Sequence, residues 1–270
     1  MATTAAIYAF SPRSHAQVPP PSISASYTAR CGSLCTKCNL REVCLPAGLS
    51  QEELKQLDGI VHQKRTLRRG QYLYRAGAPL QSLYAVRTGF LKSCVLHDDG
   101  REQVAGFHMM GELLGMDAIG SSKHMCDVVA LEDAEICEVS FGELEQLSRA
   151  IPALQQHFHR MMSREITRDY GVMLLLGSMR AEERLAAFLL NLSQRFAARG
   201  YSATRFVLRM TREEIGSYLG LKLETVSRAF SRFQSDGWIA VQNKNIELKG
   251  IPGLRKLVGQ GTRVLIHGSR

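Results

Sequence analysis

The chain has 270 residues, of which 45% are hydrophobic, and its mean hydropathy is close to zero. This length suits one or two domains with cores of their own and excludes a mini-protein that depends on disulfides. The sequence contains no run of about 18 apolar residues and no secretory signal pattern, so we expect a cytoplasmic protein without a membrane span.

The net charge of +9 is unevenly distributed along the chain. Residues 1–174 hold 18 Lys and Arg against 18 Asp and Glu, whereas residues 175–270 hold 16 against 7. All of the net positive charge therefore lies in the last third. A basic module of this kind suits a polyanionic partner, and nucleic acid is the first candidate.

Residues 1–30 are rich in Ala, Ser, Thr and Pro, which predicts a disordered extension to which we assign no function. Seven cysteines follow, at 31, 35, 38, 44, 94, 126 and 137. An odd number without a secretory signal argues against a disulfide framework and favours metal or redox chemistry.

Four of the cysteines form the cluster Cys31-x3-Cys35-x2-Cys38-x5-Cys44. A structural zinc site usually adds a second Cys or His pair nearby; none follows, which weakens the zinc interpretation without eliminating it. Three thiolates in one loop plus a distant fourth suit an iron-sulfur cluster better. Cys94 and Cys126 have no cysteine neighbours in the sequence and are expected to be free thiols.

Beyond the cysteines, Ser50-x-x-Glu53 has the spacing of a capping box and predicts a short amphipathic helix. From about residue 66 to 141, short apolar runs alternate with glycines, which indicates an all-β barrel or roll. Its strands include 71–75, 82–87 and 90–96, and Asp98-Asp99-Gly100 is the best hairpin turn.

A long helix is predicted from Pro152 to about Leu176. Apolar residues recur along one face of it, with an acidic residue set among them. These positions are Phe158, Met162, Ile166, Asp169, Met173 and Leu176. Such a stripe predicts a dimerisation seam, although a helix packed only on its own roll would show the same pattern.

The last third predicts a winged helix-turn-helix. After an amphipathic helix over 180–198, Thr211-x-x-Glu214 caps a second helix, Leu219-Gly220-Leu221 makes a tight turn, and a third helix runs from about 223 to 235. Residues 238–241 and 246–248 then form a hairpin wing. A helical hairpin of purely structural type remains an alternative, but the concentrated positive charge weighs against it.

In this order, the roll, long helix and winged helix-turn-helix resemble the transcription regulators related to the cyclic-AMP receptor protein, and in detail the oxygen-sensing FNR branch. The resemblance covers residues 31–248. Its densest matches are Cys35-x2-Cys38-x5-Cys44, Leu83-Tyr-Ala-Val-Arg87, Glu102-Gln103-x2-Gly106-Phe107-His108, Ala181-Glu-Glu-Arg-Leu-Ala-Ala-Phe188 and Glu224-Thr-Val-Ser-Arg228.

The resemblance implies an α+β chain with a cyclic-nucleotide-binding-like jelly roll, and it implies site residues. A [4Fe-4S] cluster would be held by Cys35, Cys38, Cys44 and, in Glu135-Ile-Cys-Glu138, Cys137. Bases would be read by Glu224, Ser227 and Arg228, and the dimer would be tuned by Ile166 and Asp169. The implied domains are 1–30 (extension), 31–49 (cluster loop), 50–150 (β-roll sensor), 151–178 (dimerisation helix) and 179–270 (winged helix-turn-helix).

It also implies a mechanism. With the cluster intact, the protein would form a homodimer, bind a palindrome like TTGAT-N4-ATCAA and activate or repress promoters of anaerobic metabolism, with RNA polymerase as a partner. Oxygen would degrade the cluster and switch binding off. Cys94 and Cys126 are outside the family pattern, and His157, Phe158 and His159 stand where close relatives carry methionines.

Two rivals remain. A cyclic-nucleotide sensor needs an Arg-Ser pair after the Gly-Glu-Leu turn, and the segment Ser121–Asp127 after Gly111-Glu-Leu113 contains no arginine, so we expect no cyclic nucleotide. An iron-sulfur enzyme needs acid-base residues around a substrate pocket. No such constellation is evident in the sequence, and we predict a regulator without catalytic residues.

Overall fold

The computed structural model describes residues 35–97 and 99–259, except for the side chains of His62 and Gln63. The predicted disordered extension, Cys31 and Asp98 of the expected hairpin turn lie outside the described residues.

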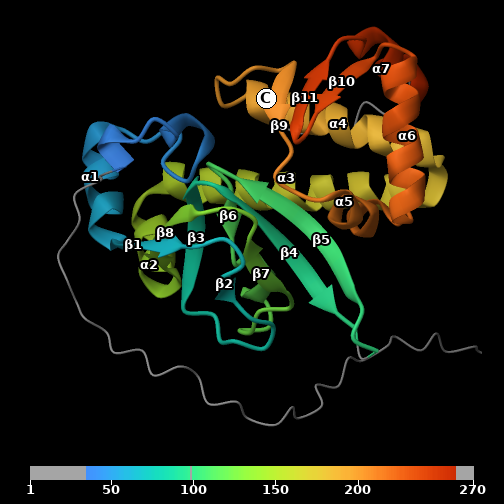
Figure 1. The fold of residues 1–270 in the computed structure, drawn as a ribbon. Helices are drawn as coiled ribbons and strands as arrows, with labels where there is room; N and C mark the ends of the chain where they lie inside the picture. The colour runs from blue at the N-terminus through green and yellow to red at the C-terminus, as the bar shows by residue number, and fades with distance from the viewer. Residues whose placement is uncertain (1–34, 98, 260–270) are drawn as a thin grey trace, which may run out of the picture. The chain divides into compact units, whose positions relative to one another are not determined.

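Two four-stranded antiparallel sheets face each other in the first half of the chain (Figure 1). One sheet has the order β1-β8-β3-β6 and the other β2-β7-β4-β5. The strands are β1 (Val61–Leu67), β2 (Tyr72–Tyr74), β3 (Ser82–Thr88), β4 (Phe90–Leu96), β5 (Glu102–Met109), β6 (Leu113–Leu114), β7 (Asp127–Ala130) and β8 (Ala134–Ser140). Inward residues of both sheets, such as Leu91 and Ile136, form a buried cluster between them. The predicted jelly-roll fold is confirmed.

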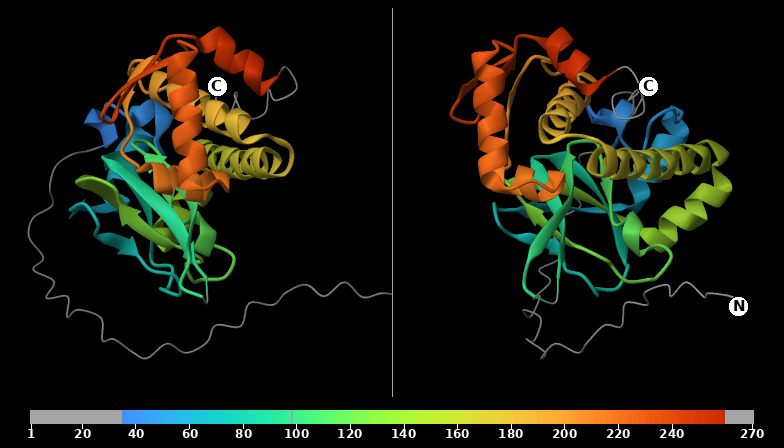
Figure 2. Two further views of the ribbon diagram at one scale, coloured as in Figure 1. Left: turned by 45° about the vertical axis from the view of Figure 1, so that its right-hand side comes forward. Right: turned by 90° about the vertical axis from the view of Figure 1, so that its right-hand side faces the viewer.

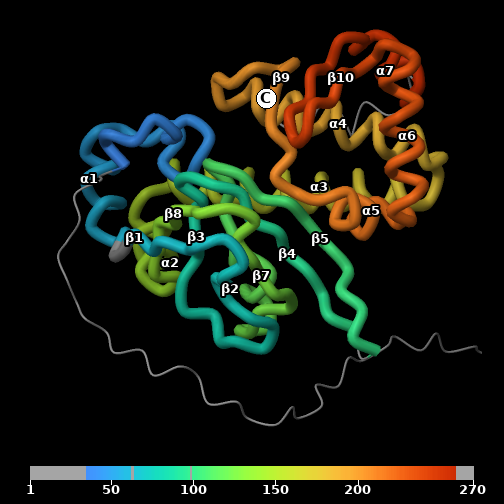
Figure 3. The backbone as a smooth tube through the Cα atoms, in the orientation of Figure 1, coloured from blue at the N-terminus to red at the C-terminus, as the bar shows by residue number. Residues whose placement is uncertain are grey.

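Short elements cover the outer face of the first sheet. The 3-10 turns η1 (Cys35–Lys37) and η2 (Arg41–Val43) precede α1 (Gln51–Ile60), which begins with the predicted Ser50–Glu53 capping box. The helix α2 (Phe141–Ala150) follows β8 directly and packs against α1. The tube in Figure 3 follows this path from the cysteine-bearing segment, in blue, into the roll.

The long helix α3 (Pro152–Ser178) starts with proline in its first turn, as predicted. It packs against α2 near its start and against α4 (Ala181–Ala197) near its end. Both views in Figure 2 show α3 as a long, uninterrupted yellow-green helix.

Up to residue 259, the last third contains a three-stranded sheet and four helices that share one buried core. After α4 come β9 (Arg205–Val207), α5 (Arg212–Leu219), α6 (Leu223–Ser235), β10 (Ile239–Gln242), β11 (Asn245–Leu248) and α7 (Ile251–Val258). The predicted helix-turn-helix is α5 and α6, and the predicted wing is β10 and β11. The core extends to Phe107 and Met109 of β5, so this module also contacts the roll.

Candidate functional site

Four cysteines predicted as ligands line one small cavity. Cys35, Cys38, Cys44 and Cys137 surround a space of about 30 Å³ whose other walls are mostly aliphatic, including Leu45 and Val139. Three of the thiols come from the segment before α1 and the fourth from the middle of β8. Residues a hundred positions apart are therefore brought to the same place.

The position of Cys137 follows from the alternation of side chains along a strand. Its neighbour Ile136 is buried in the cluster between the two sheets. Cys137 points to the opposite face, where it pairs in register with Lys64 of β1 and Ala85 of β3 and packs on the cluster that includes Leu45. A central strand thus presents this thiol to the cysteine segment.

The cysteine segment is anchored at both ends by polar contacts. The backbone N–H of Cys35 donates to Oδ1 of Asp58 in α1 at 2.5 Å, and the Thr36 hydroxyl donates to the other carboxylate oxygen. The carbonyl of Cys44 lies 3.1 Å from Nε2 of His157 on α3. Asp58 and His157 were not predicted, because neither carries a spacing signal that relates it to the cysteines.

Burial governs the charge state of these thiols. It raises the pKa of Cys44 to about 12, with the neighbouring Cys137 and Cys38 adding to the effect, and it raises the pKa of Cys35 and Cys137 as well. Without a cation the thiols of Cys35, Cys44 and Cys137 are therefore neutral, and binding of a metal centre would release their protons.

The donor set fits a thiolate-bound centre. Four soft sulfur donors in an apolar surrounding are what iron-sulfur clusters use. Within residues 35–97 and 99–259, no three His, Cys, Asp or Glu side chains are already arranged to hold a metal ion. Cys35, Cys38, Cys44 and Cys137 are the residues that could hold such a group.

Cys94 and Cys126 do not line this cavity. Cys94 is buried on β4 with its sulfur 3.8 Å from the carbonyl of Asp127, and Cys126 lies 3.7 Å from the carboxylate of Asp117. Their environments are those of separate thiols within the roll.

The second candidate site is the exposed face of α6. Thr211 accepts a hydrogen bond from the N–H of Glu214 to cap α5, and Gly220 adopts the left-handed conformation, with φ 62°, that the tight turn requires. At Gly216 a Cβ atom would lie 2.6 Å from the carbonyl oxygen of Leu221, so only glycine allows the two helices to approach this closely.

The faces of α6 separate polar from apolar residues. Val226, Phe230 and Phe233 are buried, whereas Glu224 and Arg228 are exposed and Ser227 is half-buried. The predicted base-reading residues therefore lie on the free face. Asn243, with φ 57°, makes the turn of the wing between β10 and β11.

The third candidate surface is on α3. Ile166 is 53% exposed and Met173 is 64% exposed, and Asp169 is exposed between them. Phe158 and Met162, at the start of the predicted stripe, are half-buried. The roll therefore leaves the second half of the stripe uncovered.

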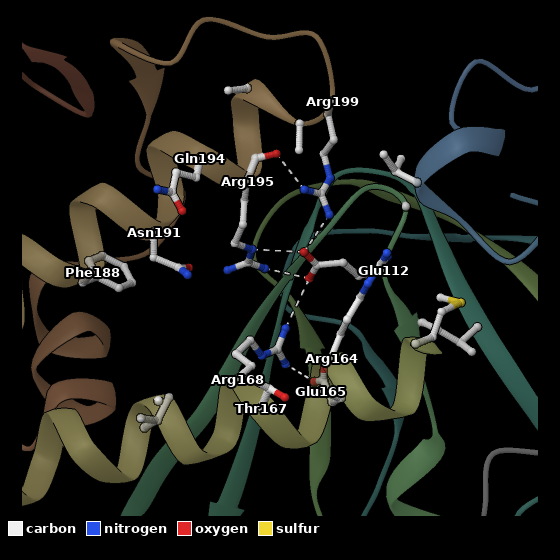
Figure 4. A pocket seen from close by; sticks show the side chains of 18 of the residues that line it. Glu112, Arg164, Glu165, Thr167, Arg168, Phe188, Asn191, Gln194, Arg195 and Arg199 are labelled. Atoms are coloured by element: carbon white, nitrogen blue, oxygen red, sulfur yellow. Dashed lines mark hydrogen bonds and ion pairs between the residues drawn. The ribbon is translucent and has the colours of Figure 1, made fainter. Parts of the chain in front are cut away.

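A group of charged residues between the roll and the last third was not predicted. Glu112, in the turn before β6, accepts hydrogen bonds from Arg195 and Arg199 and pairs with Arg168 of α3 (Figure 4). These residues border a cavity of about 450 Å³. The arginines come from separate parts of the sequence, so no local pattern could have identified the group.

The chain is similar to known regulators. Residues 64–150 match the cyclic nucleotide-binding domain model and residues 183–257 the Crp-like helix-turn-helix domain model. The transcriptional regulatory protein btr of Bordetella pertussis is 50% identical over 84% of this chain and 93% of its own length. The fumarate and nitrate reduction regulatory protein of Escherichia coli is 46% identical over 87% and 94%. The structure of FixK2 from Bradyrhizobium japonicum is 31% identical, has a TM-score of 0.67, and covers 72% of this chain and 96% of its own.

Proposed function

The chain belongs to the CRP/FNR family of DNA-binding transcription regulators, and we propose that it is an oxygen-responsive member whose activity depends on a [4Fe-4S] cluster. The observation that carries the proposal is the common cavity of Cys35, Cys38, Cys44 and Cys137. As its relatives are regulators, the chain is not an enzyme.

The bound cluster would supply oxygen-labile iron, so that loss of iron reports the presence of oxygen. The residues of the chain provide the connection to the rest of the molecule. Asp58 holds the start of the cysteine segment on α1, and His157 holds its end on α3. A change in the segment is therefore transmitted to the helix that carries the exposed apolar stripe.

We further propose that this stripe forms the interface of a homodimer, with Ile166 and Asp169 setting its strength. Large apolar side chains exposed along one helix are costly in water and mark an association surface. A two-fold axis along α3 would place two copies of α6 on a palindromic site such as TTGAT-N4-ATCAA.

On DNA, Glu224, Ser227 and Arg228 would reach base edges in the major groove. An arginine can form two hydrogen bonds with guanine, and a glutamate can accept one from cytosine N4. RNA polymerase would be the protein partner at promoters. We expect no cyclic nucleotide, because the Ser121–Asp127 segment has no arginine to bind its phosphate.

None of the helices within the described residues is both long and apolar enough to cross a bilayer. We propose that the protein acts in the cytoplasm.

Anaerobic purification with a visible absorption spectrum and iron and sulfide analysis tests the proposal. Wild type and Cys94→Ser should carry the same iron and sulfide, whereas Cys137→Ser should lose most of both. Wild type should bind the palindrome without oxygen and release it in air. A colourless protein, or full iron content in Cys137→Ser, would contradict the proposal.

A further inference from the structure

Glu112 stands where three parts of the molecule meet. Its turn links β5 to β6 of the roll, while its carboxylate faces α3 and the end of α4 (Figure 4). The side chain of Glu112 is 17% exposed, and those of Arg195 and Arg199 are 13% and 7% exposed. These contacts are therefore largely shielded from water. Ion pairs that are shielded from water fix the relative positions of their partners most strongly.

The pairing with Arg195 has a fixed orientation. Nε of Arg195 donates to Oε1 of Glu112 at 3.0 Å and Nη2 donates to Oε2 at 2.6 Å, which is the two-point geometry of guanidinium and carboxylate. Nη2 of Arg195 also donates to the carbonyl of Phe107 at 2.6 Å. This bond ties the last turn of α4 to β5.

Arg199 adds a second attachment just after α4. Its Nη2 donates to Oε1 of Glu112 at 2.7 Å, and its Nε donates to the carbonyl of Met110. Its Nη1 donates to the carbonyl of Arg195 at 2.6 Å, at the C-terminal end of the helix, where a positive charge is favoured. Two arginines of the DNA-binding module thus converge on one carboxylate of the roll.

The same turn is in contact with the cysteine segment. Gly111 has φ 85°, and a Cβ atom there would lie 2.7 Å from Cγ2 of Val43. Val43 directly precedes Cys44, so the segment packs on the backbone next to Glu112. A displacement of Val43 toward this turn must move it, because the space between them is too small even for a Cβ atom.

The arrangement leaves Glu224 and Arg228 of α6 exposed. The ion pairs of Glu112 are among the contacts between the roll and the DNA-binding module in this orientation, in which the reading face is free. Weakening them should reduce binding to DNA.

We propose that Glu112 is a positioning residue for DNA binding: it fixes the DNA-binding module on the roll at the turn that contacts the cysteine segment. The segment then has a direct connection to α4 that does not pass through the dimer interface on α3. This role deepens the proposed function and rests on it for the meaning of the cysteine segment.

The first test compares Glu112→Gln with Glu132→Gln on anaerobically prepared protein. Glu132 is a matched control, since Oε2 of this roll residue pairs with Nε of Arg209 in the DNA-binding module at 3.0 Å, but it is not on the Gly111 turn. Iron content and sedimentation of each variant are measured alongside binding of the full palindrome and of a single half-site.

At concentrations where sedimentation finds both proteins dimeric, Glu112→Gln should retain the iron of wild type, bind the palindrome about tenfold more weakly, or about 1.4 kcal/mol, and bind the half-site with unchanged affinity. A module that is intact but loosely oriented gives this result, because only the palindrome requires two modules to be in place together. Glu132→Gln should change neither by more than about twofold. An unchanged or tighter palindrome complex, equal weakening on both DNAs, or the same loss in Glu132→Gln would overturn the role.

Arg195→Gln removes the ion pair between Arg195 and Glu112 by changing the arginine. It provides a second test if Glu112→Gln does not fold. The loss of palindrome binding in the double variant should be smaller than the sum of the two single losses, because both single variants remove the Glu112–Arg195 contact. Additive losses would overturn the pairing as the cause. These comparisons can be made on dimeric protein with or without iron. A wild type that is purified without iron would therefore refute the proposed oxygen response, while the DNA-binding measurements would still test the role of Glu112.

A separate measurement tests the direct connection between the cysteine segment and α4. At concentrations where sedimentation finds both forms dimeric, the iron-loaded wild type should bind the palindrome several-fold more tightly than the iron-free form, and Glu112→Gln should lose this difference. Equal affinities of the two wild-type dimers would overturn the connection.

Discussion

The helices α3 and α6 are both amphipathic, but only α6 has its apolar face covered within the chain. In α6 the large apolar residues Phe230 and Phe233 are at most 1% exposed, and polar residues occupy the free face. In α3 the apolar residues Ile166, Tyr170 and Met173 are all more than half exposed.

The contrast assigns different roles to two patterns that look alike in a sequence. A free polar face such as that of α6 can bind a polar, charged partner without changing the fold. A free apolar face such as that of α3 favours burial against another apolar surface, and a second copy of the same helix supplies one. Substitutions in the two helices test this contrast, because the apolar face of α6 should matter for folding and the exposed apolar face of α3 for association.

The largest effect is expected at Phe233. This side chain is fully buried in the core of the DNA-binding module, and Phe233→Ala should lower the free energy of unfolding by about 3 to 5 kcal/mol through lost contacts and a cavity. Met173→Ala on α3 should change it by less than about 0.5 kcal/mol, because Met173 is exposed in a single chain. Urea denaturation of the dilute, iron-free protein measures both. Similar losses in the two variants would remove the distinction between the helices.

An intermediate effect is expected at Arg228 on the free face of α6. Arg228→Ala should weaken the palindrome complex by about 1 to 3 kcal/mol and relax the preference at one base position. Lys222→Ala, at the exposed start of the same helix, should weaken all sequences alike if it contacts a phosphate. Binding to a panel of half-site variants separates the two. A preference that survives intact at every position in Arg228→Ala would reject base reading.

The two helices also show what a sequence can reveal. The capping residues Ser50 and Thr211 and the turn at Gly220 lie next to the elements they delimit, so α1, α5 and α6 could be predicted. The same signal, Ser140 with Glu143, starts α2, which had not been assigned from the sequence. The strand β9 is only three residues long and depends on pairing with β11, so nothing local marks it.

The candidate sites too could be predicted only where their residues lie close together in the sequence. The grouping of Cys35, Cys38 and Cys44 is visible as spacing, whereas the approach of Cys137 depends on sheet register and was expected only from the family resemblance. The convergence of Arg195 and Arg199 on Glu112 depends on how two modules pack. Long-range packing, not local propensity, determines these contacts.

The smallest effect, and the one most specific to α3, is expected at Asp169. A two-fold axis along the helix would bring two Asp169 carboxylates toward each other, close also to the charged groups of Arg164, Glu165 and Arg168. In the single chain Arg168 is paired with Glu165 and Glu112, which leaves less of its charge to offset Asp169. Repulsion between the two carboxylates, screened by water and salt, should oppose the dimer by about 1 kcal/mol.

Asp169→Ala should therefore tighten dimerisation of the iron-free protein about fivefold in sedimentation experiments, and Asp169→Asn should do nearly the same, because the charge is the cause. Partial burial already raises the pKa of Asp169 in the single chain, with Arg168 opposing the shift, and a second carboxylate would raise it further in the dimer. The dimer then binds protons more tightly than the monomers do, so dimerisation of the wild type should strengthen as the pH falls toward this raised pKa. Neither variant should share the part of the pH dependence that comes from Asp169. If Asp169→Ala weakened the dimer, the carboxylate would instead be making a favourable contact with an arginine of the second copy. The charge of Asp169 would then not limit association of the apolar face of α3, and this part of the contrast with α6 would fail.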